Sequence, residues 1–466
     1  MKLKKILATA LLGASSLNMM GSGYEKVVLW SAKNSGMANS GASSMVSGAD
    51  AVYYNPAGLS WGSEGKLTNN NWNDHQVSVN FSPTRVQFEG AVVSSARTSE
   101  SDASWLPISA LLASHRINNQ WAVGYGFYTA GGTVAKHSNV DFTSVSSQFS
   151  NYRPNVKADI TLTEFALSGG YQINSNFSVG AAWRVLMVRG EFASAKVSYL
   201  ASNNQAVAMS GVEVKDLKDE KYNGFRLGMQ YKSDDRKWGM GLTYRSSVTF
   251  KATGATSGGV IYTSVGQAVM ASQSVTVSPN TLYALNQSGS TTVENSLPDQ
   301  LTLGGYYNLT SAWTLAGELA WTNYSKNNEV RTAGSVVDTS SGATTALPNT
   351  AQGWKDMYQM KLGAEYEMQK DLTLRGGYAL TSQVTSSTAA KATFSAPGLG
   401  HTFTFGGSKG FKNNSYFLDL AAEYSVASKS GQTADESTNA LLLTPPMTGK
   451  FVASAMGIHA ALKINF

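Results

Sequence analysis

Two patterns in this chain suggest catalysis, and neither fits its surroundings. Ser408 lies in "GGSKG" at residues 406–410, which matches the G-x-S-x-G pattern of a serine nucleophile. That nucleophile needs a sharp turn from a strand into a helix. Here the motif lies in "HTFTFGGSKGFKNNSYF", which reads as a strand that runs into a hairpin turn, so we predict ordinary strand glycines. The histidines show no spacing typical of metal ligands; they are His75, His115, His137, His401 and His459.

Acidic side chains on one face of several predicted strands could resemble paired catalytic carboxylates. They are Glu318, Glu365, Glu367, Asp419 and Glu423. Basic side chains on neighbouring strands offer partners, namely Arg226, Arg245, Lys361 and Arg375. Opposite charges facing each other across strands stabilise one another, so we expect a neutralised polar lumen instead of a catalytic pair. No phosphate-binding loop or dinucleotide fingerprint occurs in a suitable context. The sequence predicts no enzyme, no cofactor and no metal site.

The N-terminus predicts export. Residues 1–5 carry three lysines, residues 6–17 are apolar and small, and residues 21–23 are Gly-Ser-Gly. This pattern is typical of a secretory signal peptide, which we place at residues 1–22 with cleavage at about 20–24. Loss of the three lysines lowers the formal net charge from +6 to +3. The remaining positive charge is too dispersed to predict nucleic-acid binding.

The composition indicates a surface that faces lipid. Charged residues make up 14% of the chain, against about 25% in an average soluble protein. Cysteine is absent, which excludes disulfides and thiolate metal sites. No apolar run after the leader reaches the ~18 residues of a membrane helix. A closed β-barrel is then the one structure that satisfies every backbone group inside a membrane.

Residues alternate with a period of two along much of the chain. In "YQMKLGAEYEM", residues 358–368, one face is apolar with aromatic ends and the other face is polar. Residues 372–381 and 416–424 show the same pattern. A soluble sandwich also alternates, but strands of about ten residues with terminal aromatics favour an outer-membrane barrel whose apolar face meets lipid.

Short polar turns and long Ser/Thr/Gly/Asn-rich connections alternate along the chain, as periplasmic turns and extracellular loops do in such barrels. We expect long loops near 136–155, 195–218, 254–296, 327–352, 387–397 and 429–448. This pattern predicts an all-β fold, a barrel of about fourteen antiparallel strands in residues 73–466 with both termini in the periplasm. The strands are expected to start near His75, Leu106, Trp121, Lys157, Phe177, Lys221, Lys237, Leu297, Trp313, Trp354, Leu372, Gly400, Ser415 and Phe451. Pro83 and Pro107 indicate strand ends, bends or a bulge in the first two.

The last strand, "FVASAMGIHAALKINF", ends on an aromatic residue of its apolar face, Phe466. A C-terminal strand that closes with Phe resembles the signal that the outer-membrane assembly machinery recognises. We therefore expect that machinery as a partner, with outer-membrane lipid around a monomeric barrel.

Residues 23–72 precede the first strand and carry many apolar side chains, among them Trp30, Tyr53 and Tyr54. A barrel of this size has a lumen too wide for its own side chains, so we predict that this segment folds into the lumen as a plug. "NSGMANSGASSMVSGADAVYYNPAGLSW" resembles the N-terminal hatch of the FadL-type outer-membrane transporters of long-chain fatty acids and other hydrophobic compounds. The motif residues that carry the resemblance are Asp50, Asn55, Pro56 and Ala57. Further similar blocks are "GLTYRS", "LPDQLTLGGYY", "AWTNYSK" and "WKDMYQMKLGAEY".

The resemblance implies passive diffusion of a hydrophobic molecule from extracellular loops to a site against the hatch, then sideways exit where the third strand kinks. In "WAVGYGFYTAGGTVA" the kink would fall at Gly131 and Gly132. The alternative is that they are ordinary barrel glycines. Lateral exit suits an apolar solute, which gains little from entering aqueous periplasm.

The positions that match the family's basic ligand contacts are Arg189 and Arg331. A lumen arginine could bind a carboxylate through paired hydrogen bonds. Arg331 falls on the inward phase of its strand or belongs to the loop above. Arg189 falls on the lipid phase unless a bulge shifts it, and it is otherwise an arginine that reaches the membrane interface.

Three functions remain open at this point. A hatch-plugged transporter of hydrophobic compounds, most of all long-chain fatty acids, explains the N-terminal segment. A general porin for small polar solutes lacks such a plug. An adhesive or structural outer-membrane barrel would use its long loops, which show no binding motif that we recognise.

Overall fold

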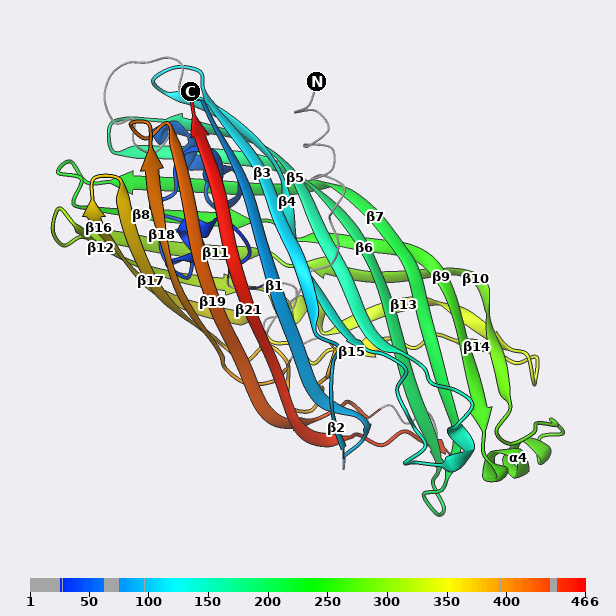
Figure 1. Ribbon diagram of the computed structural model, residues 1–466. Coiled ribbons are helices and arrows are strands. Elements are labelled where there is room, and N and C mark those ends of the chain that lie inside the picture. The colour runs from blue at the N-terminus through cyan, green and yellow to red at the C-terminus, as the bar shows by residue number, and fades with distance from the viewer. Residues whose placement is uncertain (1–25, 27, 63–74, 96, 394–395, 436–441) are drawn as a thin grey trace.

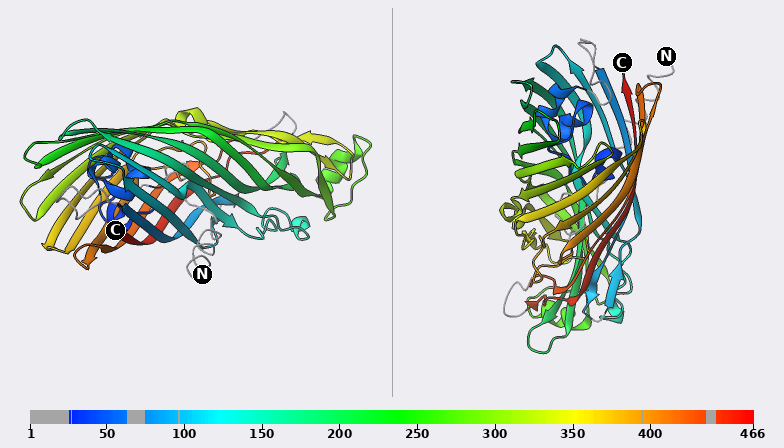
Figure 2. Two further views of the ribbon diagram at one scale, coloured as in Figure 1. Left: turned by 90° about the horizontal axis from the view of Figure 1, so that it is seen from above. Right: turned by 90° about the vertical axis from the view of Figure 1, so that its left-hand side faces the viewer.

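The computed structural model describes residues 26, 28–62, 75–95, 97–393, 396–435 and 442–466. The predicted signal peptide, residues 1–22, lies outside these ranges. The chain forms a closed antiparallel barrel of fourteen strand positions, as predicted. Both the barrel and its long extension to one side are visible in Figure 1, and Figure 2 shows the barrel from two further directions.

Each strand position pairs with its sequence neighbour, and the last strand closes the wall against the first. The first six strand positions along the chain are β1 (His75–Ser94), β3 (Ser104–Arg116), β4 (Trp121–His137), β5 (Val156–Gln172), β6 (Phe177–Leu200) and β7 (Ala206–Lys232). Three positions consist of two strands each: β8 and β9 (Trp238–Arg245, Val248–Tyr262), β10 and β11 (Leu282–Leu297, Gln300–Asn308), β12 and β13 (Trp313–Thr322, Glu329–Asp338). The last five strand positions are β16 (Met357–Gln369), β17 (Leu372–Thr381), β18 (Gly400–Phe411), β19 (Tyr416–Gln432) and β21 (Thr448–Asn465).

Smaller elements lie in the connections. They are β2 (Arg97–Glu100), η3 (Ser147–Phe149), α4 (Ser264–Ala271), η4 (Tyr324–Asn327), β14 (Thr344–Ala346), β15 (Thr350–Ala351) and β20 (Leu442–Leu443). Within the described part of the chain, no helix has the length and apolar character needed to cross a membrane.

The expected loops at 195–218 and 254–296 were wrong in large part, because strands fill them. β6 ends only at Leu200 and β7 begins at Ala206, and the two pair along this extension. β9 and β10 likewise pair through much of 254–296. A membrane strand needs only about 9–11 residues, so these strands continue beyond the bilayer. Ser, Thr and Gly dominate there because no lipid requires an apolar outer face, and the sequence therefore resembled loops.

Side chains divide between the two faces of the wall as the alternation predicted. In β16, Met360 and Leu362 are exposed on the outside, whereas Gln359 and Lys361 are buried inside. The apolar outer face is the one that lipid covers, and the polar inner face lines the lumen.

The extension beyond the bilayer gives a testable difference between two leucines of one strand position. Leu303 in β11 and Leu282 in β10 are 45% and 47% exposed. Replacement of Leu303 by Arg is expected to lower the free energy of unfolding in lipid vesicles by about 2–4 kcal/mol, because it places a charge in hydrocarbon. Replacement of Leu282 by Arg should change it by less than about 0.5 kcal/mol, as at other water-exposed sites. Equal losses for both variants would contradict the placement of β10 outside lipid.

Candidate functional site

The lumen holds a folded N-terminal segment, residues 28–62. Its elements are α2 (Ala32–Ser35), η1 (Gly48–Asp50), α3 (Ala51–Tyr54) and η2 (Pro56–Trp61). Nearly all of its residues are buried. η2 contacts β5, β6 and β7, η1 contacts β1 and β3, and α2 contacts β18, β19 and β21. The segment therefore meets the wall on opposite sides of the barrel, in dark blue in Figures 1 and 2.

Glycines on the inner wall let the segment approach the strands closely. A methyl group added to Gly180 of β6 would overlap the backbone of Pro56, and one added to Gly228 of β7 would overlap Asn55. Further wall glycines in the same relation to the segment are Gly241, Gly363 and Gly377. A side chain at these places would push the segment away from the wall, since the nearest atoms are mostly backbone.

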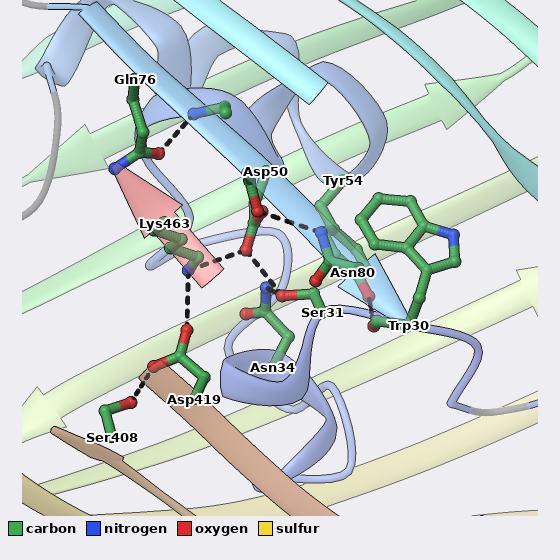
Figure 3. Close-up of polar contacts among 12 residues, drawn as sticks. Trp30, Ser31, Asn34, Asp50, Tyr54, Gln76, Asn80, Ser408, Asp419 and Lys463 are labelled. Carbon is green, nitrogen blue, oxygen red and sulfur yellow. Dashed lines mark hydrogen bonds and ion pairs between the residues drawn. The ribbon is translucent and has the colours of Figure 1, made fainter. Parts of the chain in front are cut away.

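Asp50 of the predicted hatch motif anchors the segment to the wall where β21 pairs with β1 and closes the barrel (Figure 3). Its carboxylate is buried and lies 3.0 Å from the ammonium of Lys463 in β21. Ser31 of the segment donates a hydrogen bond of 2.6 Å to it, and Ser78 of β1 donates one of 3.2 Å. One side chain thus joins the segment to the first and last strands at once.

Asn55 and its two neighbours shape the segment from within. The Asn55 amide donates to the carbonyl of Ser43 at 2.7 Å and to that of Met229 in β7 at 3.0 Å. Its carbonyl oxygen accepts from the N–H of Ala57 at 3.1 Å, which caps η2. Pro56 starts that helix, where its missing N–H costs nothing. Asn55, Pro56 and Ala57 therefore shape the segment itself, and the Asn55 amide adds one hydrogen bond to the wall.

Ser408 belongs to the polar network of the lumen. It donates to Asp419 and accepts from Arg375, whose Nε also contacts Glu365 at 2.6 Å. Asp419 in turn lies 3.4 Å from Lys463. This chain of alternating charges confirms the neutralised lumen for these residues, and it gives Ser408 no histidine as a general base.

A second buried ion pair was missed by the sequence analysis. Glu164 of β5 and Arg184 of β6 form an ion pair, and both are fully buried. The hydroxyl of Tyr128 donates to Glu164 at 3.0 Å. Arg184 also donates to the carbonyl of Ser246 at 3.2 Å, where the wall is interrupted between β8 and β9. Strict alternation from the outward Trp183 was the signal that could have placed Arg184 inside.

A small polar cavity of about 60 Å³ lies between the N-terminal segment and the wall. Its charged lining residues are Lys26, Arg226, Arg245, Glu318 and Lys361. Glu318 contacts Lys361 at 2.9 Å, and Lys26 pairs with Glu423. The guanidinium of Arg226 lies 4.7 Å from the centre of the Tyr53 ring, and its Nη1 finds no hydrogen-bond partner in the described part of the chain. Four cationic side chains and one carboxylate line the cavity, so its lining carries a net positive charge.

An apolar cluster adjoins the cavity on the side of β4. Trp30, Val52 and Leu59 of the segment pack there with side chains of the wall. The wall members near them include Leu106, Ile108, Leu112, Tyr128, Ala130 and Val134. Polar and apolar side chains therefore lie side by side in the lumen.

β4 changes its pairing at the predicted kink position. It pairs with β5 up to His137, with a β-bulge between Thr129 and Gly131. Gly132 has φ 150°, a conformation that side chains disfavour. Pairing with β3 ends at Ala110–Tyr128, so β3 and β4 separate directly before the glycine pair.

The two predicted ligand cations do not line the cavity. Arg189 is exposed, opposite in phase to the buried Val188 of an interior cluster. Arg331 is also exposed, and our inward phase for it was wrong: its neighbour Val330 faces inside, while Arg331 pairs with Glu294 at 3.4 Å and Glu329 at 3.2 Å. Arg189 keeps the outward phase counted from Trp183, and Val330 keeps the inward, even-numbered phase of Glu318 and Ala320 in β12, which places Arg331 outside.

The last residue lies beside the first strand. Phe466 and His75 exchange two backbone hydrogen bonds of 3.1 Å, and the Phe466 ring is 58% exposed. Its role as an assembly signal remains a prediction. Among the described residues, no group of three or more His, Asp or Glu side chains is arranged to hold a metal ion.

Comparison with known proteins adds the family. A model of the family described as "Outer membrane protein transport protein (OMPP1/FadL/TodX)" matches residues 22–466. The chain belongs to this family. It is an outer-membrane barrel of a family of transport proteins, not of enzymes.

Two FadL/TodX relatives show how far the sequence has diverged. The long-chain fatty acid transport protein of Escherichia coli O6:H1 is 24% identical over 291 residues, 58% of this chain and 59% of the relative. That of Salmonella typhi is 26% identical over 230 residues, 47% of this chain and 49% of the relative. The chain thus spans only about half to six tenths of these relatives.

Solved FadL/TodX structures share the fold along almost the whole chain. A Pseudomonas aeruginosa FadL homologue has a TM-score of 0.66 at 15% identity and covers 97% of this chain and 100% of its own. The Pseudomonas putida toluene transporter TodX has 0.65 at 17% identity and covers 93% and 97%. At these identities the likeness shows the architecture alone.

The glycine contacts predict how tightly this FadL/TodX barrel holds its segment. Gly180→Val is expected to raise amide hydrogen exchange of residues 50–61 by about tenfold, because overpacking costs about 1–3 kcal/mol. Gly169→Val is the matched control on β5, since a methyl group there meets no atom within 4 Å. Exchange measured by mass spectrometry should leave the barrel strands protected in both variants. Unchanged exchange in Gly180→Val would contradict the close fit.

Proposed function

We propose that this chain carries hydrophobic compounds through the outer membrane by passive diffusion, with long-chain fatty acids as the substrate class. The N-terminal segment acts as the hatch, held in place by Asp50, Asn55, Pro56 and Ala57. The molecule leaves sideways between β3 and β4, at Gly131 and Gly132. The names of the fatty acid transport proteins to which the chain is similar support the substrate class.

The observation that carries the proposal is Arg226. This guanidinium is 4% exposed, lines the polar cavity, and keeps Nη1 without a hydrogen-bond partner within the described residues. An unpaired buried donor on a charged group is costly unless a ligand completes it. A carboxylate supplies a negative charge and two acceptor oxygens, the best match for a guanidinium.

The cavity is smaller than a fatty acid, so the proposal requires the hatch to move. A cavity of about 60 Å³ holds a carboxylate group but no acyl chain. The acyl chain would follow the apolar cluster around Trp30 and Tyr128, which becomes continuous with the cavity once the N-terminal segment shifts. Burial of the chain against these side chains supplies about 0.8 kcal/mol per CH₂.

Aromatic hydrocarbons are the second candidate, because the apolar cluster is rich in aromatic rings. Trp30 lies 4.7 Å from Tyr53 and 5.4 Å from Tyr54, measured between ring centroids. Such rings stack favourably with an aromatic solute. Two of the solved structures that share the fold are described as a toluene transporter and a monoaromatic hydrocarbon channel.

Arg226→Met separates the two substrate classes. In cells that lack their own fatty-acid transporter, uptake of labelled oleate at low concentration is expected to fall by about tenfold, since charge-assisted hydrogen bonds contribute about 1.5–3 kcal/mol. Entry of toluene should stay unchanged. Arg189→Met, an exposed arginine, is the matched control and should leave both unchanged. Absence of oleate uptake in the parent barrel would refute the fatty-acid assignment, and equal loss of both substrates would refute the role of Arg226.

Gly132→Val tests the sideways exit. Valine at φ 150° is strained, at a cost of about 1–3 kcal/mol, so the strand is expected to straighten and close toward β3. Uptake of oleate and of toluene should then fall together, because both would leave by the same route. Heat-modifiable migration on a gel confirms that the variant barrel is folded. Undiminished uptake by a folded variant would argue against exit at this position.

A further inference from the structure

The stretch where β3 and β4 fail to pair has sharp limits. β3 pairs with β1 from Ser104 onward, but with β4 only from Ala110 onward. Above the unpaired stretch, the N–H of Asp102 donates to the carbonyl of Lys136 in β4 at 2.7 Å. We call the intervening stretch the seam: residues 104–109 of β3 and 129–135 of β4. It is an opening in the hydrogen-bond ladder with both ends closed.

The phase of the ladder shows which backbone groups face the seam. Below it, the N–H of Ile117 donates to the carbonyl of Trp121 at 2.9 Å. Because directions alternate along a strand, the odd-numbered residues of β3 point their N–H toward β4. Ala110–Tyr128 is the last pair of this ladder, and Ser109 with Thr129 would be the next in register. This pair is the first that does not form.

Trp30 of the hatch segment occupies the place of the missing bond. Its indole N–H donates to the carbonyl of Thr129 at 3.1 Å. The ring is fully buried and packs 5.6 Å from Tyr128 between centroids. The hydroxyl of Tyr54 donates a hydrogen bond of 2.8 Å to the backbone carbonyl of Trp30. The acceptor that Ser109 would need is therefore satisfied by a side chain of the segment.

Pro107 removes the next donor. It is the following odd-numbered residue of β3, so its nitrogen faces β4 and carries no hydrogen. Its register partner in β1 is Pro83, whose nitrogen by the same alternation faces β21. The β1–β21 pairing is interrupted from Ser82 to Pro83, as this direction requires. The proline pair thus leaves the β1–β3 ladder intact. It removes one N–H donor from the edge of β1 that faces β21 and one from the edge of β3 that faces β4.

We propose that Trp30 and Pro107 are positioning residues that hold the seam unpaired: Trp30 takes the first acceptor, and Pro107 withholds the second donor. The inference rests on the proposed function for its purpose, since an unpaired seam serves lateral exit. Its geometric content, that these two side chains prevent β3 and β4 from pairing, stands independently of any substrate.

Engineered cysteine pairs test the geometry, because the chain has no cysteine of its own. The test pair is Ser109→Cys with Thr129→Cys. The matched control is Leu111→Cys with Phe127→Cys, which are partners in the formed ladder. Both pairs are introduced into the parent, into Trp30→Phe, into Pro107→Ala and into the double variant. The purified barrel is oxidised in lipid vesicles, and the rate of disulfide formation is measured.

In the parent, the control pair is expected to cross-link rapidly and the test pair slowly. Each restored or released hydrogen bond should speed cross-linking of the test pair by about fivefold, with the largest gain in the double variant. The control pair should be unaffected, which also shows that the variants fold. The inference is overturned if the test pair already matches the control in the parent, or if the variants leave its rate unchanged.

Oleate uptake by Pro107→Ala without cysteines separates this inference from the proposed function, because Pro107 lies outside the apolar cluster that the acyl chain would follow. A seam that pairs together with reduced uptake supports both claims. A seam that pairs while uptake persists supports the role of Trp30 and Pro107 and refutes lateral exit.

Discussion

Every backbone N–H and C=O inside hydrocarbon must find a partner within the protein, and the rest of this structure depends on that constraint. The barrel meets it by closing β21 against β1. Where the wall departs from regular pairing, side chains take over: Arg184 donates to the carbonyl of Ser246, and Trp30 donates to that of Thr129. Proline meets the same constraint in another way, since it has no N–H to satisfy. Irregular wall is thus possible only where the interior supplies donors.

The N-terminal segment is fixed by two different means. Wall glycines such as Gly180 and Gly228 allow contact over a broad surface, which depends on shape alone. Asp50 with Lys463 is instead a buried ion pair, whose desolvation offsets most of its attraction. Its contribution is position more than stability, because Asp50 is the one acidic residue of residues 28–62 and contacts that ammonium and the hydroxyls of Ser31 and Ser78 together. The segment is thus held by close fit over a broad surface and by one polar anchor.

Period-two alternation predicted the barrel, its strand number and the polar lumen, because lipid imposes a strict rule on the outer face. It failed where lipid is absent: β7 begins at Ala206, well before the predicted Lys221, and β10 begins at Leu282. The phase of Arg331 was also wrong: Val330, and not Arg331, continues the inward phase of Glu318 and Ala320 in β12. The cavity around Arg226 was missed because it joins β7 to a segment far away in the chain. Such a site depends on contacts between residues far apart in the chain, which local sequence patterns do not reveal.

The polar cavity and the seam are linked by direct contacts. The guanidinium of Arg226 lies 4.7 Å from the Tyr53 ring, that ring lies 4.7 Å from Trp30, and Trp30 donates to Thr129 at the edge of the seam. A ligand changes a conformation only by binding one state better than another. If the proposed headgroup drew Arg226 away from Tyr53, the packing of Trp30 against Tyr53 would change with it. In the proposed mechanism, capture of the headgroup and the lateral opening would share this short row of residues, in which Tyr53 and Trp30 belong to the N-terminal segment.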